Sequence, residues 1–306
     1  MTRSTLLVIA TTLTLLLPGG ASAQVKHYPL EATDGLRLHN VAAEPAVLQG
    51  KKGLRVTLSD ETLRRFKGMT DDELGDVQAR VGQYAVIEGL EFSDGVITAE
   101  VAGASAPGAG PGARGFVGIA FRLYNGAYEL FSLRLTNGRA EDQERRNHST
   151  QYSSLPNWPW FRLRKEAPSR YESYVDLLPD VWTTIRIEVR GNRARLYVHG
   201  QEQPTLIVND LKSGVQRSGK VALWINYGTV GHFRNLTVMP DAHGAGPGRT
   251  PRALIHETLL DQSRPHLGYL RADGCVPAVE RPRATRQPEN VNPAYWSSHS
   301  RSSHVS

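Results

Sequence analysis

One stretch, residues 115–153, constrains the fold of this chain more than any other segment. Every second residue is apolar along two runs, in the order Val117, Ile119, Phe121, Leu123 and then Phe131, Leu133, Leu135. A period of two with one apolar face is typical of a half-buried strand. Asn125 and Gly126 lie between the two runs, and this dipeptide is a strong signal for a tight hairpin turn. The stretch therefore predicts two long antiparallel strands.

The length of the turn decides which residues pair. A two-residue loop at 125–126 would place Arg122 on the same face as Phe131. A three-residue loop, Asn125–Ala127, keeps the apolar residues on one face and pairs Phe121 with Phe131. Because a slip of one residue turns a whole strand over, we predict the three-residue loop.

This register has a consequence for the other face of the hairpin. Arg122, Ser132 and Arg134 would lie together there, and Tyr124 would face Tyr128 near the turn. Two arginines and two tyrosines on the outer face of a sheet are the first indication of a functional site.

The rest of the chain adds short strands and little helix. Further apolar alternation appears at 54–58, 83–89, 95–102, 182–189, 194–199, 205–211, 220–226 and 231–238. Residues 59–76 break this period: Ser59 starts a helical pattern, and Thr70 with Glu73 resembles a capping box. Many short strands at close spacing predict an all-β fold, an antiparallel two-sheet jelly-roll sandwich, with the helical insertion over a sheet edge.

The two ends of the chain differ in composition from the predicted domain, residues 24–240. Residues 1–23 have a basic start, the apolar run Leu6–Leu17 and the small residues Ala21–Ala23, which together predict a signal peptide. We expect a secreted or periplasmic protein. The apolar run is too short to span a bilayer, and no other stretch is apolar enough, so no stable membrane insertion is expected.

Residues 241–306 are rich in Arg, Pro, His and Ser and poor in apolar residues, which predicts a disordered tail. The only cysteine, Cys275, excludes an internal disulfide and a cysteine-based zinc site. The chain carries a formal net charge of +6. This charge fits either an ordinary basic exported protein or one attracted to polyanions. Arginines alternate with acids and form no block that could track phosphates, so no nucleic acid partner is expected.

Four segments in this order resemble a known superfamily. They read GFVGIAFRLYNGAYELFSLR, WTTIRIEVRGNRARLYVHGQ and GKVALWINYGTVGHFRNLTV, preceded by a strand of the form GxxxAxVA. The pattern is similar to the concanavalin A-like lectin/glucanase superfamily, and most similar to its secreted bacterial laminin-G-like and 3-keto-disaccharide-hydrolase-like domains. The likeness covers about residues 83–240. It implies the sandwich fold, with a ligand on the outer face of one sheet or on its rim loops, but it does not specify an activity.

The chemistry of the superfamily's glucanases is not supported. They place Glu-x-Asp-x-(x)-Glu on one strand, and this chain contains no Glu-x-Asp. The cofactor expectation is none, with calcium at Asp210 as an open alternative suggested by laminin-G-like domains. Calcium needs several oxygens from different loops, and Asp210 after Asn209 is equally suited to cap a turn. No other metal site is indicated.

One set of residues has the character of a sugar site. Strand 147–152 is polar on both faces, as expected of a strand that lines a wet groove, and an aromatic-rich connection follows it. Sugars are bound by aromatic faces and by planar amide and guanidinium groups. The predicted ligand-binding residues are Arg122, Arg134, Tyr124, Tyr128, Asn147, Gln151, Trp158 and Trp160.

Three functions remain open. The first is glycan binding on the outer face of one sheet. The second is a glycoside-acting enzyme of the 3-keto-disaccharide-hydrolase type, with Glu172, His148 and Glu129 as candidate acids or bases. The third is a protein-interaction domain of the cell envelope. A structural explanation stands beside them: the arginines would pair with acids such as Glu172 or Asp176, and the tryptophans would cover the end of the sandwich.

Overall fold

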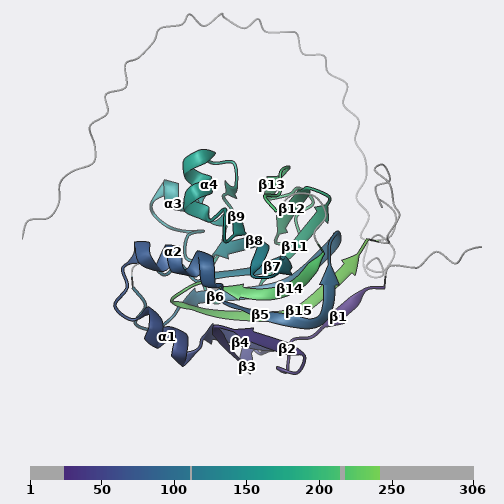
Figure 1. Cartoon of the computed structure of the whole chain (residues 1–306), viewed down its shortest axis with the longest axis horizontal. Helices are drawn as coiled ribbons and strands as arrows, with labels where there is room; N and C mark the ends of the chain where they lie inside the picture. Colours follow the sequence, from purple (N-terminus) through teal and green to yellow (C-terminus); the bar gives the residue numbers. More distant parts are fainter. Residues whose placement is uncertain (1–23, 111, 214–217, 242–306) are drawn as a thin grey trace, which may run out of the picture. The chain divides into compact units, whose positions relative to one another are not determined.

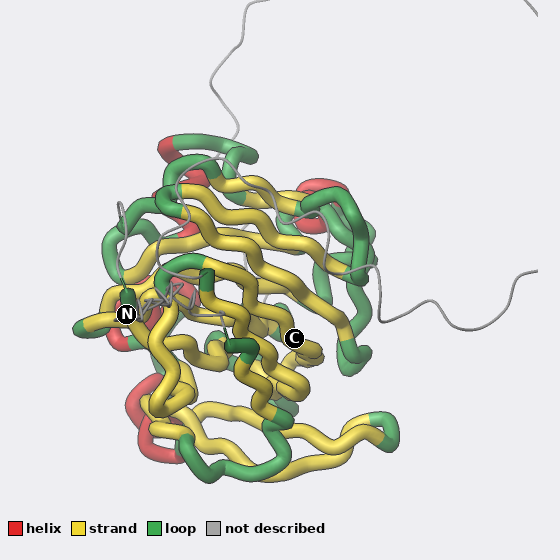
Figure 2. Tube along the Cα trace, turned by 90° about the vertical axis from the view of Figure 1, so that its right-hand side faces the viewer, coloured by secondary structure: helices red, strands yellow, loops and turns green. Residues whose placement is uncertain are grey.

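The computed structural model describes residues 24–110, 112–213 and 218–241. Within them, the strands form an eight-stranded and a seven-stranded sheet whose neighbours all pair antiparallel (Figure 1). One cluster of buried apolar residues, contributed by both sheets, fills the space between them. Figure 2 shows how strongly strands dominate the described chain, with the helices at its periphery. The predicted all-β sandwich is confirmed.

The eight-stranded sheet is called sheet A. Its strands are β1 (Lys26–Tyr28), β3 (Val41–Leu48), β4 (Lys51–Leu58), β6 (Gly95–Ser105), β11 (Thr183–Arg190), β12 (Arg193–Val198), β13 (Leu206–Val208) and β15 (Thr229–Pro240). Their order is β13-β12-β11-β6-β15-β4-β3, and β1 pairs with β15. Sheet A therefore holds both the first and the last described strand.

The seven-stranded sheet is called sheet B. Its strands are β2 (Leu36–His39), β5 (Tyr84–Phe92), β7 (Phe116–Tyr124), β8 (Ala127–Arg134), β9 (Thr150–Leu155), β10 (Glu172–Ser173) and β14 (Gly219–Ile225). Their order is β10-β9-β8-β7-β14-β5-β2. Residues 115–153 thus supply most of three neighbouring strands of sheet B, β7, β8 and β9.

Two helices form the predicted insertion. They are α1 (Asp60–Phe66) and α2 (Asp71–Val81), so the insertion extends five residues beyond the predicted end at 76. Ser59 caps α1, because its side chain accepts a hydrogen bond from the amide of Thr62. Thr70 and Glu73 form the predicted capping box of α2.

Two further short helices were not predicted. They are α3 (Gln143–Asn147) and α4 (Trp160–Glu166), and both lie in segments interpreted from the sequence as loops or strand. The predicted polar strand 147–152 begins only at Thr150, because Asn147 ends α3 and His148 caps it.

The hairpin register differs from the prediction. Tyr124 pairs with Ala127, so the turn contains two residues, Asn125 and Gly126, both with positive φ. Such a turn favours Asn-Gly because both positions are left-handed. The register then shifts between Phe121 and Tyr124, where Arg122 has a φ of 54°.

This bulge places one extra residue in β7. It restores the apolar face that a regular two-residue hairpin would have lost. Phe131 therefore pairs with Ile119 rather than with Phe121, and the predicted three-residue loop is wrong. Six of the seven residues predicted for this face belong to the central core: Val117, Ile119, Phe121, Phe131, Leu133 and Leu135. Leu123, which follows the bulge, belongs instead to the apolar cluster that contains Tyr128 and Leu130.

Several predictions fall on residues outside the described ranges. The leader at 1–23 and residues 242–306 of the predicted tail belong to these, so both stay predictions. Among the described residues, no helix is both long enough and apolar enough to cross a membrane.

Candidate functional site

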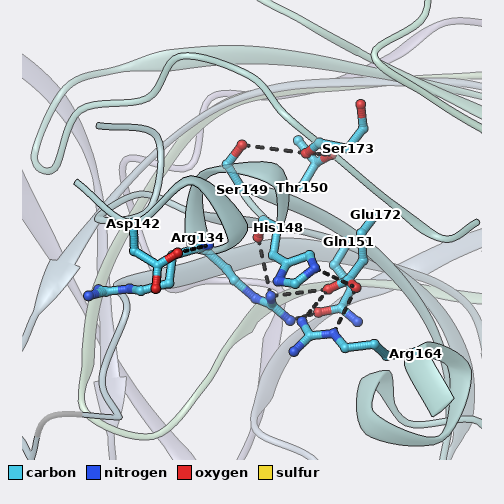
Figure 3. Close-up of polar contacts among 10 residues, drawn as sticks. Arg134, Asp142, His148, Ser149, Thr150, Gln151, Arg164, Glu172 and Ser173 are labelled. Carbon is cyan, nitrogen blue, oxygen red and sulfur yellow. Dashed lines mark hydrogen bonds and ion pairs between the residues drawn. The ribbon is translucent and has the colours of Figure 1, made fainter. Parts of the chain in front are cut away.

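Four of the predicted site residues converge at the β9–β10 edge of sheet B. Glu172 is their centre: its Oε1 accepts hydrogen bonds from Arg134 Nη1 at 3.1 Å and from Arg164 Nη2 at 2.6 Å. Its Oε2 accepts from Arg164 Nε at 2.9 Å and lies 3.6 Å from Nε2 of His148. Arg134 also donates to Gln151 Oε1 and, at 3.2 Å, to the carbonyl of His148. Figure 3 shows both guanidinium groups turned toward the Glu172 carboxylate.

The strand register brings these side chains together. Ser132 of β8 pairs with Gln151 of β9, and Gln151 pairs with Glu172 of β10. The three side chains therefore stand in one row on the outer face of sheet B. Arg134, two residues beyond Ser132, shares this face.

Short helices bring the remaining groups to this edge. Asp142 caps α3 by accepting hydrogen bonds from the amides of Glu144 and Arg145, and the helix ends at Asn147 and His148. Arg164 belongs to α4, which packs against β9. Arg164 was missed in the sequence because residues 160–166 were interpreted as a loop. The helical run WFRLRKE after Pro159 was the signal that could have revealed it.

The charges of the cluster are fixed by their surroundings. Burial raises the pKa of Glu172, but the hydrogen bonds from Arg164 and the charges of Arg134 and Arg164 outweigh it and hold that pKa below its ordinary value. Burial lowers the pKa of Arg134 to about 10. Burial is the largest influence on His148 and lowers its pKa; the charge of Glu172 opposes this shift without reversing it, and the charges of Arg164 and Arg134 add to it. At neutral pH the cluster thus holds an ionised carboxylate beside an uncharged imidazole.

A pocket of about 370 Å³ opens onto this cluster. Small-molecule sites occupy roughly 300–1,000 Å³, so the pocket can hold a ligand of that kind. Its walls are mostly polar and come from α3, α4 and β10 with their flanking residues. They are Glu144, Asn147, His148, Arg164, Pro168, Ser169, Glu172, Ser173 and Tyr174. We call this the β10 pocket.

The middle of the outer face of sheet B is closed. Leu130, Ser132, Gln151 and Ser153 are all buried. Gly75, Gln78 and Ala79 of α2 and Trp160 of α4 line the same small cavity as these residues, and its volume is only about 40 Å³. The open groove expected across this face is therefore absent among the described residues, where the small cavity and the buried side chains close its centre.

Arg122 lies away from the other predicted ligand-binding residues. The bulge of β7 directs its side chain to the carbonyls of Ser93 and Gly191 and to Oδ1 of Asp94, each at 2.8 Å. Arg122 is 2% exposed. Its hydrogen bonds link the turn at Ser93 and Asp94 to the turn at Gly191, at one end of the sandwich. The expectation that it shares a face with Arg134 is wrong.

The two tyrosines of the hairpin do not form a groove either. Tyr124 is exposed beside the β7–β8 turn. Tyr128 is buried on the outer face of sheet B, where its hydroxyl accepts a hydrogen bond from Trp224 Nε1 at 3.2 Å and its ring meets Tyr84 edge-on. The expected contact between the two tyrosines is absent from the ring contacts of the described residues.

The tryptophans differ in their surroundings. Trp158 carries the guanidinium of Arg162 over its ring at 3.8 Å and the ammonium of Lys212 at 4.9 Å. Trp160 is 38% exposed, and its ring lies beside the guanidinium groups of Arg134 and Arg164 at 5.5 and 4.7 Å. Trp160 therefore adjoins the cluster, whereas Trp158 is occupied by two cations.

Glu129 lies on the inner side of sheet B and does not line the β10 pocket. It is fully buried, where its carboxylate accepts hydrogen bonds from the Tyr152 hydroxyl at 2.6 Å and the Ser213 amide at 2.8 Å. Its contacts therefore fasten the segment around Ser213 to the core.

Asp210 is surrounded by cations rather than by other acids. Its Oδ2 accepts hydrogen bonds from the Tyr171 hydroxyl and from Lys212, and it pairs with Arg170 at 3.2 Å. Positive neighbours oppose calcium binding, which needs several converging oxygens. In the described part of the chain, no group of three or more His, Cys, Asp or Glu residues could hold a metal ion.

Comparison with known proteins gives a likeness in fold. No family model matches the chain, and no curated protein matches it significantly. Similar solved structures include the carbohydrate-binding module CBM66 from Bacillus subtilis, with a TM-score of 0.42 and 13% identity over 67% of this chain and 95% of that one. A Bacillus subtilis protein with a galectin-like fold has a TM-score of 0.41 and 12% identity over 70% and 94% of the two chains.

The beta-glucanase of Bacillus licheniformis has a TM-score of 0.35 and 10% identity over 70% of this chain and 97% of that one. The sandwich expected from the sequence is defined by the chain's own two antiparallel sheets. Nothing about activity follows from a likeness of this degree.

The cluster predicts how stability depends on pH. A group whose pKa is lower in the folded state than in the unfolded state contributes stability above its ordinary pKa. This stability is lost as pH falls. We expect the free energy of unfolding to decline from about pH 6.5, through His148 and the buried His232, and more steeply below about 4.5, through Glu172. Urea unfolding across this range measures it. In His148→Gln the decline between these two values should be smaller than in the original protein, and an unchanged decline would contradict the assignment to His148.

Proposed function

We propose that this protein binds a sugar of a glycan in the β10 pocket. The observation that carries this proposal is the convergence of Arg134, Arg164 and Glu172 beside the neutral ring of His148 at the floor of a polar pocket. Sugar hydroxyls both donate and accept hydrogen bonds, so they need fixed partners of both kinds. Among the groups that line the pocket, the ionised Glu172 carboxylate accepts, the Arg164 guanidinium donates, and the His148 imidazole does one with each ring nitrogen.

The rim of the pocket offers further groups of the right type. Asn147 adds a planar amide, and Ser169 and Ser173 lie in the wall. Tyr174 adds an aromatic ring that is 43% exposed, with the guanidinium of Arg146 at 5.4 Å from the ring centroid. An exposed aromatic ring at the mouth of a polar pocket can pack against the apolar face of a sugar ring.

The charge balance of the pocket favours a neutral sugar. Glu172 and Glu144 oppose Arg164 in the lining and Arg134 behind it, so the ionised groups cancel when His148 is uncharged. A ligand with a full charge would gain no net attraction there.

Replacement of Tyr174 tests the site directly. Glycan arrays identify a ligand, and calorimetry then compares the variants. Tyr174→Ala should weaken the affinity by about fivefold or more, because each stacked ring contributes on the order of 1 kcal/mol or more. Tyr124→Ala is the matched control, since Tyr124 is also exposed but lies on another part of sheet B. Equal affinities for the two variants would contradict the assignment of the site.

One contact also favours an enzyme that acts on a glycoside, of the 3-keto-disaccharide-hydrolase type. His148 is a neutral imidazole oriented by an ionised carboxylate, which is the arrangement of a general base. Glu172 itself is unsuited to act as a general acid, because its pKa is held low. Release of product from 3-keto-glycosides, lost in His148→Gln, would establish this second function.

A further inference from the structure

The β11–β12 hairpin of sheet A carries three exposed arginines on one face. Arg190, Arg193 and Arg195 are called the hairpin arginines. The alternate residues of both strands point into the core, among them Val189 and Ala194. The hairpin arginines therefore stand on the outer face of sheet A, and they share no residue with the β10 pocket.

The register places their charges close together. Arg190 pairs directly with Arg193, and Arg195 follows two residues along β12. Opposed residues in antiparallel strands have Cα atoms about 4.5–5.5 Å apart, and alternate residues of one strand are about 7 Å apart. Like charges directly opposite each other destabilise a strand pair. The hairpin thus keeps an arrangement that folding alone does not favour.

The acids beside the hairpin arginines are already occupied. Glu188, opposite Arg195, pairs with Arg186 and accepts a hydrogen bond from the Tyr197 hydroxyl at 3.0 Å. Asp94 is bound by Arg122 and by the amide of Gly191 at 2.9 Å. No ion pair within 4.0 Å joins a hairpin arginine to any acid of the described residues.

The positive charge is local to this hairpin. The residues that the structure describes hold 26 Lys and Arg against 25 Asp and Glu, so this part of the chain is nearly neutral as a whole. A cluster of three unpaired arginines on a neutral background is therefore not explained by basic composition. It produces a field that attracts anions to this one face.

We propose that the hairpin arginines bind an anionic polysaccharide through its successive carboxylate groups. A guanidinium group matches a carboxylate with two parallel hydrogen bonds, and it loses less hydration than an ammonium group does. Three such groups spaced by about 5–7 Å on a flat strand surface can meet acidic groups that repeat along a polymer. Ile207, which is opposite Arg195, is exposed beside them.

A membrane surface fits this face less well. Proteins that lie on membranes combine basic residues with Trp, Phe or Leu side chains that enter the lipid. Among the described residues, the exposed side chains of these three types are Leu38, Leu63, Trp160, Phe161 and Leu178, and none of them lies on the hairpin.

Binding to polygalacturonate tests the proposal. The affinity should fall as salt is raised, and methyl-esterified polygalacturonate, which lacks the charges, should not bind. The variant R190Q/R193Q/R195Q should bind polygalacturonate about tenfold more weakly or worse, because three exposed ion pairs with the polymer are removed together. Arg193→Gln alone should show part of this loss, which keeps the test available if the triple variant does not fold.

A matched control separates the patch from overall charge. The variant R37Q/R55Q/R139Q removes the same charge from three exposed arginines that are each paired with an acid, Glu88, Glu44 and Asp176 respectively. It should bind polygalacturonate like the original protein. Equal losses in both triple variants, no binding by the original protein, or stronger binding to anionic lipid vesicles would each overturn the proposal. Tyr174→Ala should keep this binding, which separates the hairpin arginines from the sugar site of the β10 pocket.

Discussion

Glu172→Gln should destabilise the fold by about 3–5 kcal/mol and remove sugar binding. Removal of one partner from a buried ion pair leaves the other charge without compensation, and this costs several kcal/mol. The side chains of Arg134 and Glu172 are 6% and 3% exposed, and Arg164 depends on the same carboxylate. Urea unfolding should show a lower midpoint with an unchanged slope, since the surface exposed on unfolding stays the same.

Two further variants make this result interpretable. Glu166→Gln removes an exposed carboxylate that pairs with Arg162 within α4, and it should change stability by no more than about 0.5 kcal/mol. The double variant Arg134→Met/Glu172→Leu should be more stable than Glu172→Leu alone, because no buried charge is left unpaired. Full stability of Glu172→Gln would show that the cluster is not desolvated as the structure indicates.

Arg122→Gln should lower the free energy of unfolding by about 3–5 kcal/mol without changing the affinity for the sugar. Its guanidinium donates to the carbonyls of Ser93 and Gly191 and to the carboxylate of Asp94. A shorter side chain removes these donors and leaves the Asp94 carboxylate with the hydrogen bond from the Gly191 amide. Denaturant unfolding gives the stability, and calorimetry at a temperature where the variant stays folded gives the affinity.

Arg37→Gln is the control for this second experiment. Arg37 also pairs with an acid, Glu88 at 2.7 Å, but both side chains are exposed. We expect a change of no more than about 1 kcal/mol. If Arg122→Gln had normal stability and weakened sugar binding, Arg122 would be a ligand-binding residue and its structural role would be refuted.

The comparison of these two arginines shows how far the sequence could predict the site. Periodicity identified the hairpin and its buried face correctly, because both follow from local patterns. The position of Arg122 depended on a bulge, and a bulge inserts a residue without any sign in the alternation. The same apolar face is compatible with a three-residue loop or with a two-residue loop and a bulge, and only the second directs Arg122 to the end of the sandwich.

The sequence predicted only part of the cluster formed by Arg134, Gln151, His148 and Glu172, and the reason is physical. Polar residues on both faces of strand 147–152 predicted a wet groove, but β9 is buried along its whole length. Its Gln151 instead accepts a hydrogen bond from Arg134 within the cluster. Arg164 was missed because its seven-residue helix α4 is too short for periodicity to establish. The closed centre of the outer face was missed because it results from α2 folding back over sheet B, a long-range packing that local patterns do not contain.

The pairing of β1 with β15 determines how the domain can be attached to another protein or to a surface. Lys26 pairs with Val238, so the chain enters and leaves the sandwich at neighbouring points of one sheet. A domain whose two ends lie this close can be inserted into a loop of another protein, or tethered to a surface, by a single short stalk. Tension on such a stalk would load β1 and β15 first, while the β10 pocket on the other sheet would carry little of it.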